Sequence, residues 1–156
     1  MTKTILFRAD GNSDIGLGHL YRLFSLVEII IDSYDFVFLT RETSEHSIIP
    51  SNYRKVCILK DLEIENEPQW LVNKYSPEEH IIIADGYQFI SSYQKLIKGY
   101  GFKLIYIDDL AKEYMYADVV INHSAGLEIT DYKKKRYATS IRYSVCFIKT
   151  IIFRYR

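Results

Sequence analysis

The sequence predicts an α/β domain built on a parallel β-sheet with helices on both faces. Two observations support this fold class. Short apolar runs recur along the chain, each followed by polar or turn-forming residues, and segments with apolar residues at helical spacing lie between several of them. Strands that alternate with helices pair in parallel, and the helices cover both faces of the sheet. With 156 residues, the chain has the length of one such domain.

Six apolar runs are predicted to be the strands of a Rossmann-like sheet. They are residues 4–8, 35–40, 55–59, 80–84, 103–107 and 118–121. Helices are predicted from Leu20 onwards, over 67–75 and over 89–100, because the apolar residues of each segment lie on one stripe. A short helix is expected in the connection around Pro50. The end of the chain, residues 143–156, has no clear period and receives no assignment.

Composition and charge exclude several classes of function. Lys+Arg and Asp+Glu both total 20, so there is no overall positive field to attract nucleic acid, and we expect no nucleic-acid partner. No apolar run approaches the roughly 18 residues that span a bilayer, so we expect no integral membrane contact. Cys57 and Cys146 lack the spacing of a disulfide framework, which indicates reduced thiols in the cytoplasm. His46, His80 and His123 show no ligand spacing, so no metal site is expected.

Polar residues that follow the apolar runs mark the expected binding edge of the sheet. In an open parallel sheet, ligands bind beyond the carboxyl ends of the strands, where the loops converge. Four loops bring candidate residues to that edge. These residues are Arg8, Asp10, Gly16, Gly18 and His19 in the first loop, Asp85 and Tyr87 in the second, Asp108 and Asp109 in the third, and Asn122 and His123 in the last.

The first loop has the most specific pattern. Gly16 and Gly18 lie at a turn into a helix, where a missing Cβ lets a substrate approach the backbone and lets φ become positive. A dinucleotide fingerprint would need a third glycine at position 21, which is Tyr21, so an NAD site is disfavoured.

His19 is the candidate general base of this loop. It would lie at or beside the first helical turn, where the positive end of the helix dipole favours a neutral, proton-accepting imidazole. The alternative is a histidine that caps the helix or hydrogen-bonds within the turn. Arg22, one turn further on, either holds an anionic group or pairs with a carboxylate.

The same residues resemble a known family. Arg8-x-Asp10 followed by Ile15-Gly16-x-Gly18-His19-x-x-Arg22 is similar to the opening of the PseG family, hydrolases that release UDP from UDP-2,4-diacetamido-2,4,6-trideoxy-β-L-altropyranose in pseudaminic acid biosynthesis. The segments Ala84-Asp85-Gly86-Tyr87, Ile107-Asp108-Asp109 and 117–122 are similar to later segments of that family, in the same order. Residues 137–143 are more weakly similar, so the resemblance covers residues 3–143.

The resemblance implies a GT-B-like architecture, in which two Rossmann-like domains face each other across a cleft, as in glycosyltransferases of the MurG type. The chain then corresponds to the amino-terminal domain, residues 1–143, and residues 144–156 form a terminal segment where the linker begins. The family's motif implies that His19 activates the attacking water and that the reaction needs no cofactor. The residues expected to contact the nucleotide-sugar substrate are Arg8, Asp10, Gly16, Gly18, Arg22, Tyr87, Asp109 and Asn122.

Four of the later candidates have alternative roles. Asp108 and Asp109 are adjacent on extended chain and point to opposite sides, so one is expected to bind sugar and the other to cap a turn. Tyr87 either stacks on the sugar or packs at the edge of the cleft. Asn122 is either a turn residue or a ligand.

The family places most nucleotide-binding residues in a second domain, for which this chain has no room. We therefore expect the missing carboxyl-terminal domain as a partner, a truncated gene product, and weak or absent turnover by the chain alone. Two alternatives stay open. The chain is the acceptor domain of a GT-B glycosyltransferase, in which His19 deprotonates a sugar or lipid hydroxyl, or it is a non-catalytic domain that binds a sugar or a partner chain.

Overall fold

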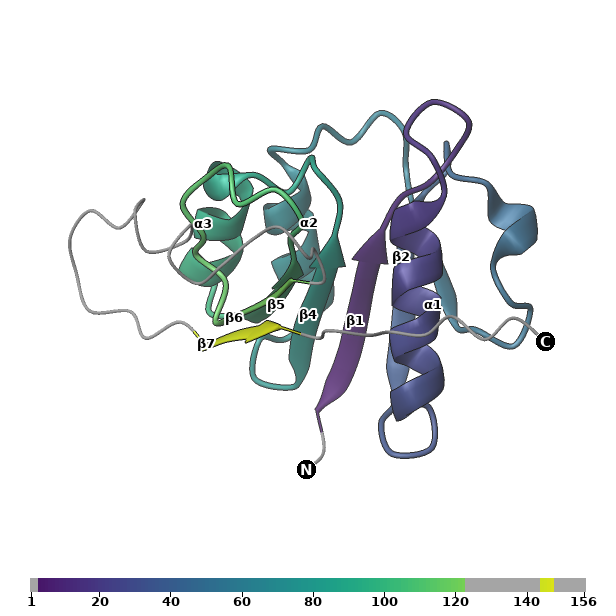
Figure 1. Ribbon diagram of the computed structural model, residues 1–156, viewed down its shortest axis with the longest axis horizontal. Helices are drawn as coiled ribbons and strands as arrows, with labels where there is room; N and C mark the ends of the chain where they lie inside the picture. Colours follow the sequence, from purple (N-terminus) through teal and green to yellow (C-terminus); the bar gives the residue numbers. More distant parts are fainter. Residues whose placement is uncertain (1–2, 123–143, 148–156) are drawn as a thin grey trace.

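The computed structural model describes residues 3–122 and 144–147, which form one parallel sheet with its covering helices (Figure 1). The strand order is β3-β2-β1-β4-β5-β6-β7, and every neighbouring pair is parallel. The strands are β1 Thr4–Ala9, β2 Phe36–Arg41, β3 Lys55–Ile58, β4 His80–Asp85, β5 Lys103–Ile107, β6 Val119–Asn122 and β7 Ser144–Phe147. The helices are α1 Gly18–Ile30, the 3-10 helix η1 His46–Ile48, α2 Glu67–Lys74 and α3 Ser91–Gly99.

The predicted fold class is confirmed, and all six predicted strands form. No bound moves by more than one residue, and β4 extends by one residue to Asp85. α1 begins at Gly18, two residues before the predicted start, so His19 lies in its first turn. α3 begins later than predicted, because Phe89 belongs to a turn in which its N–H donates to the carbonyl of Gly86.

The sheet continues past the predicted domain end at residue 143. Ser144–Phe147 pairs in parallel with β6 as β7, where we expected the start of a linker. The segment combines β-branched and aromatic residues, which suit a strand, and β6 offers an open edge to pair with. The similarity over residues 137–143, the candidate His123 and the terminal residues 148–156 lie outside the described residues.

Side chains alternate between two cores, one on each face of the sheet. On one face Leu20, Leu23 and Val27 of α1 pack against Ile5 and Phe7 of β1. On the other face, α2 and α3 pack against a separate core. That core includes Leu6, Leu39, Leu71, Ile82, Tyr93, Ile97 and Leu104. Successive residues of a strand point to opposite faces, which explains why β1 supplies both cores.

The strand order creates a switch point between β1 and β4. The chain runs from β1 outwards to β2 and β3, then returns to β4 on the other side of β1 and continues to β5 and β6. The helices that follow β1 and β4 lie on opposite faces, so the carboxyl ends of these two strands border a crevice. Open α/β sheets bind ligands at such a crevice. No helix in the described ranges combines the length and apolar character needed to cross a bilayer.

Arg8 anchors a buried ionic network beneath this crevice. Its Nε and Nη2 donate to the Glu67 carboxylate at 2.7 and 3.0 Å, and its Nη1 and Nη2 donate to Asp10 at 2.6 and 2.8 Å. Glu67 also accepts from the Tyr93 hydroxyl at 2.8 Å and from Arg41 at 3.2 Å. Burial acts to raise the pKa of Asp10, but the Arg8 guanidinium outweighs it and lowers that pKa below its ordinary value. The network ties β1 to α2 and α3.

Replacing Glu67 with glutamine is expected to lower the free energy of unfolding by about 3 kcal/mol, because Arg8 keeps its charge at 0% exposure and loses a charged partner. Glu65→Gln is the matched control, since Glu65 is exposed two residues away and should change stability by less than about 0.5 kcal/mol. Urea unfolding of both variants measures the difference in the free energy of unfolding, provided that the dependence of this free energy on urea concentration is the same in both. Equal losses in the two variants would contradict the assigned role of Glu67.

Candidate active site

His19, Asp85 and Arg22 meet at the switch point. His19 Nδ1 lies 2.8 Å from Oδ1 of Asp85, the last residue of β4 and 66 residues further along the chain. Arg22, one turn after His19, donates from Nε to Asp85 Oδ2 at 2.7 Å and from Nη2 to Asp85 Oδ1 at 2.6 Å. The Asp85 carboxylate is fully buried and His19 is 7% exposed. α1 therefore supplies both partners of a single carboxylate.

Two close contacts of Nδ1 bear on which imidazole nitrogen carries the proton. Arg22 Nη2 lies 2.6 Å from His19 Nδ1, so Nδ1 has a donor and an acceptor as neighbours. A carboxylate oxygen accepts several hydrogen bonds, and Asp85 Oδ1 can accept from both Nδ1–H and Nη2–H. If Arg22 instead donated to an unprotonated Nδ1, two acceptor atoms, Nδ1 and Asp85 Oδ1, would lie 2.8 Å apart with no proton between them. We therefore assign the proton to Nδ1, which leaves the lone pair on Nε2.

Nε2 is the chemically available atom of this ring. His19 makes no hydrogen bond through Nε2 within the described part of the chain. Among the described residues that surround the ring, Tyr87 packs edge-on against it with 4.8 Å between ring centroids. Tyr87 is 54% exposed, so this wall of the site faces solvent. An imidazole with Nδ1 held by a carboxylate and Nε2 available is the arrangement of a general base.

Arg22 links this pair to the loop after β5. Its Nη1 donates to Asp109 Oδ2 at 3.0 Å, and the same oxygen accepts from the Tyr87 hydroxyl at 3.2 Å. Burial lowers the pKa of Arg22, but its hydrogen bonds to Asp85 and Asp109 outweigh burial and raise that pKa above its ordinary value. Of the two roles open for Arg22, carboxylate pairing is confirmed. One guanidinium thus lies between two carboxylates from different loops.

The aspartate pair behaves as expected from its strand geometry. Asp108 accepts from the backbone N–H groups of Leu110 and Ala111 at 3.3 and 2.8 Å, so the turn-capping role is confirmed for Asp108. Asp109 faces Arg22 and Tyr87 instead. Asp108 therefore caps the turn, whereas Asp109 belongs to the cluster around Arg22.

Arg8 and Asp10 lie behind the site and do not reach its surface. Arg8 is 0% exposed and every guanidinium nitrogen is engaged, so a substrate contact would require its pairing with Asp10 and Glu67 to open. Asp10 accepts from the backbone of Arg41 at 2.8 Å as well as from Arg8. Both residues support the loops. Asn122, at the end of β6, is 1% exposed.

Gly16 adopts the left-handed conformation that its loop requires. Its φ is +79°, and its N–H donates to the carbonyl of Asn12 at 2.9 Å. The Asn12 side chain accepts from the N–H groups of Asp14 and Ile15, which closes the turn. Gly18 begins α1, and a Cβ added to it would meet no atom of the described residues within 4 Å, so sterics do not require glycine there.

Gly86 holds the turn between Asp85 and Tyr87. Its φ is +155°, and an added Cβ would lie 2.4 Å from Oε1 of Gln88. Gln88 cannot move away without cost, because its amide donates to Asp10 at 3.1 Å. The carbonyl of Gly86 accepts from the Tyr106 hydroxyl at 3.0 Å. The turn that presents Asp85 is thus fixed on both sides.

Replacing Gly86 with alanine is expected to destabilise the fold by about 1–3 kcal/mol, because the backbone conformation is strained for a residue with a Cβ. Gly99→Ala is the control, since Gly99 lies in α3, an added Cβ would meet no atom of the described residues within 4 Å, and alanine favours the helix. In thermal unfolding, the melting temperature should fall for Gly86→Ala and rise for Gly99→Ala. A Gly86→Ala protein as stable as Gly99→Ala would show that the turn tolerates a side chain.

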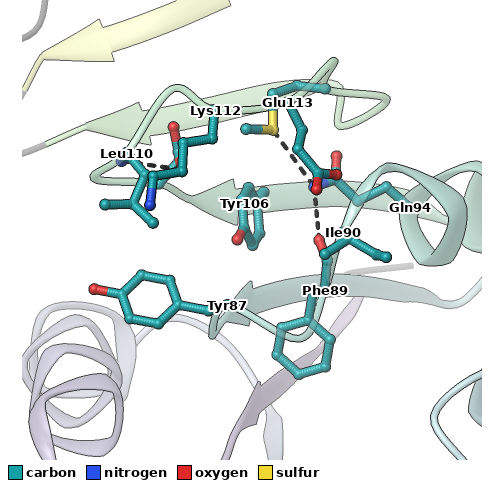
Figure 2. A pocket seen from close by; sticks show the side chains of 10 residues that line it. Tyr87, Phe89, Ile90, Gln94, Tyr106, Leu110, Lys112 and Glu113 are labelled. Carbon is teal, nitrogen blue, oxygen red and sulfur yellow. Dashed lines mark hydrogen bonds between the residues drawn. The ribbon is translucent and has the colours of Figure 1, made fainter.

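A pocket of about 430 Å³ opens beside the cluster, at the carboxyl ends of β4 and β5 (Figure 2). Tyr87 belongs to both places, since its ring contacts His19 and also lines the pocket. The other lining residues follow β4 or β5 in the chain or belong to β5 and α3. They are Phe89, Ile90, Gln94, Tyr106, Asp108, Leu110, Lys112, Glu113 and Met115. None of the expected substrate-binding residues except Tyr87 lines it.

Asp85 belongs to the cluster around His19 but was left out of the predicted site. Its position at the binding edge was expected, but its role depends on β4 lying beside β1, and strand order is not a local property of the chain. The available signal was its position directly after the apolar run 80–84. In the described ranges no three His, Cys, Asp or Glu side chains come together as a metal site would need.

Comparison with models of known protein families gives no match for this chain, and comparison with curated protein sequences gives none either.

Proposed function

We propose that the chain is the amino-terminal half of a nucleotide-sugar hydrolase, which releases UDP from UDP-2,4-diacetamido-2,4,6-trideoxy-β-L-altropyranose with His19 as general base. The observation behind this proposal is the His19 imidazole held through Nδ1 by Asp85 at the switch point, with Nε2 available. The sugar assignment rests on the resemblance of the motifs around His19, Asp85 and Asp109 to the PseG family. The expected partner is a second, nucleotide-binding domain, and the expected location is the cytoplasm.

The proposed reaction uses only water and the side chains of the cluster. The oxygen of a water molecule attacks the anomeric carbon, the bond from that carbon to the β-phosphate oxygen breaks, and UDP leaves with the bonding electrons. The water proton moves to Nε2 of His19, and Asp85 stabilises the imidazolium that forms. The carboxylates of Asp85 and Asp109 favour the positive charge that develops on the sugar.

Hydrolysis in ¹⁸O-labelled water tests the proposal. The chain, alone and together with a separately supplied UDP-binding domain of a two-domain hydrolase, is mixed with the nucleotide sugar, and UDP and sugar are analysed by mass spectrometry. We expect UDP release with ¹⁸O in the sugar and none in UDP. Release that depends on an added sugar or lipid acceptor would instead identify a glycosyltransferase. Absence of release under both conditions would leave a binding domain.

A further inference from the structure

The pocket beside Tyr87 has apolar walls close to the proposed reaction centre. Phe89, Leu110 and Met115 supply aromatic and aliphatic surface, and Tyr87, which lines the same pocket, contacts the His19 imidazole. Figure 2 shows Tyr87 and Leu110 at one end of the pocket and Gln94 and Glu113 at the other. A group that rests on Tyr87 from the pocket side therefore lies one aromatic ring away from His19.

Three polar side chains of the pocket, those of Gln94, Asp108 and Tyr106, hold its walls, whereas the charged Lys112 and Glu113 are exposed. The Gln94 amide donates to the carbonyl of Phe89 at 2.9 Å and accepts from the backbone of Tyr116 and Ala117. Asp108 accepts from two backbone N–H groups of its own turn. The Tyr106 hydroxyl donates to the carbonyl of Gly86. A ligand hydroxyl beside Gln94 would lose water without gaining this amide as a partner, because both its NH2 group and its oxygen are already hydrogen-bonded.

We propose that this pocket is the subsite for the methyl-bearing substituents of the sugar, its acetamido and deoxy methyl groups, and that Leu110 and Met115 select such a sugar over a fully hydroxylated hexose. The inference rests on the proposed function for the position of the sugar. A volume of about 430 Å³ lies near the lower end of ligand pockets, which suits substituents of one sugar ring better than a whole nucleotide sugar. Methyl groups gain from apolar walls, whereas hydroxyl groups do not.

The pocket contains a convenient reporter. The chain has 2 methionines, so ¹³C-methyl labelling of methionine gives few signals, and the Met115 signal is assigned by its loss in Met115→Leu. The His19→Ala chain is used so that no turnover occurs. We expect UDP-2,4-diacetamido-2,4,6-trideoxy-β-L-altropyranose to shift the Met115 signal and UDP-glucose to leave it in place. An unmoved signal with both compounds overturns the proposal.

A pair of leucine variants tests selectivity. Leu110→Asn is expected to weaken binding of the diacetamido compound by about 10- to 100-fold. The ratio of its affinity to that of UDP-glucose should therefore fall. Leu59→Asn is the control, because Leu59 is 64% exposed after the edge strand β3 and should change neither affinity. Equal weakening of both compounds by Leu110→Asn contradicts the assigned selectivity.

The outcomes separate this inference from the proposed function. A shifted Met115 signal and a selective Leu110→Asn effect, without UDP release by the unaltered chain, support the subsite and reject the hydrolase. UDP release with an unmoved Met115 signal supports the hydrolase and rejects the subsite.

Discussion

Replacing His19 with alanine is expected to slow UDP release by about 10²- to 10⁴-fold, the range that general base catalysis contributes. The substitution removes Nε2, the proposed acceptor of the water proton, and leaves the Arg22–Asp85 ion pair in place. Because the base acts on water in the transition state, kcat should fall while KM changes little. Steady-state kinetics of UDP release, with any second domain at a saturating concentration, measure both constants.

His80→Ala is the control for this prediction. The His80 imidazole is hydrogen-bonded too, to the carbonyl of Ser76, but His80 lies at the start of β4, the end opposite to Asp85. The His80→Ala chain should keep its full rate. If His19→Ala released UDP as fast as His80→Ala, with equal melting temperatures in both, His19 would not be the base.

Replacing Asp85 with asparagine is expected to lower kcat by on the order of 10³-fold, because loss of the carboxylate that holds Nδ1–H allows the wrong imidazole tautomer. An asparagine amide can donate to Nδ1, which moves the ring proton to Nε2 and removes the lone pair that accepts from water. Arg22 also loses its bidentate partner. Imidazole ¹⁵N spectra report the tautomer directly, and a purely structural role of Asp85 would leave the tautomer unchanged.

Asp118→Asn is the matched control for Asp85→Asn. Asp118 is also ion-paired, with Lys98 and Lys103, but it precedes β6 at the opposite edge of the sheet. This variant should keep both the rate and the His19 spectrum. An Asp85→Asn chain with normal kcat and an unchanged His19 spectrum would reject the positioning role.

Local patterns were sufficient for the elements of the fold. Every predicted strand formed within one residue of its expected bounds, because buried strands appear as short apolar runs and the turn residues after them break those runs. The short helix near Pro50 and the positive φ of Gly16 follow from the same local chemistry. β7 was missed, because the stretch 143–156 that contains it alternates apolar and basic residues without a clear period, and its pairing partner β6 is about 20 residues away in the chain.

The sequence by itself determined that a parallel α/β sheet forms and that His19 lies in the first turn of the helix after β1, since both follow from periodicity and turn residues over short stretches. Only the tertiary structure decided which loops meet. It brought Asp85 to His19 across 66 residues, withdrew Arg8 into a buried network with Glu67, and built the pocket beside Tyr87 from segments after two strands. These contacts depend on strand order, which arises from the packing of the whole chain.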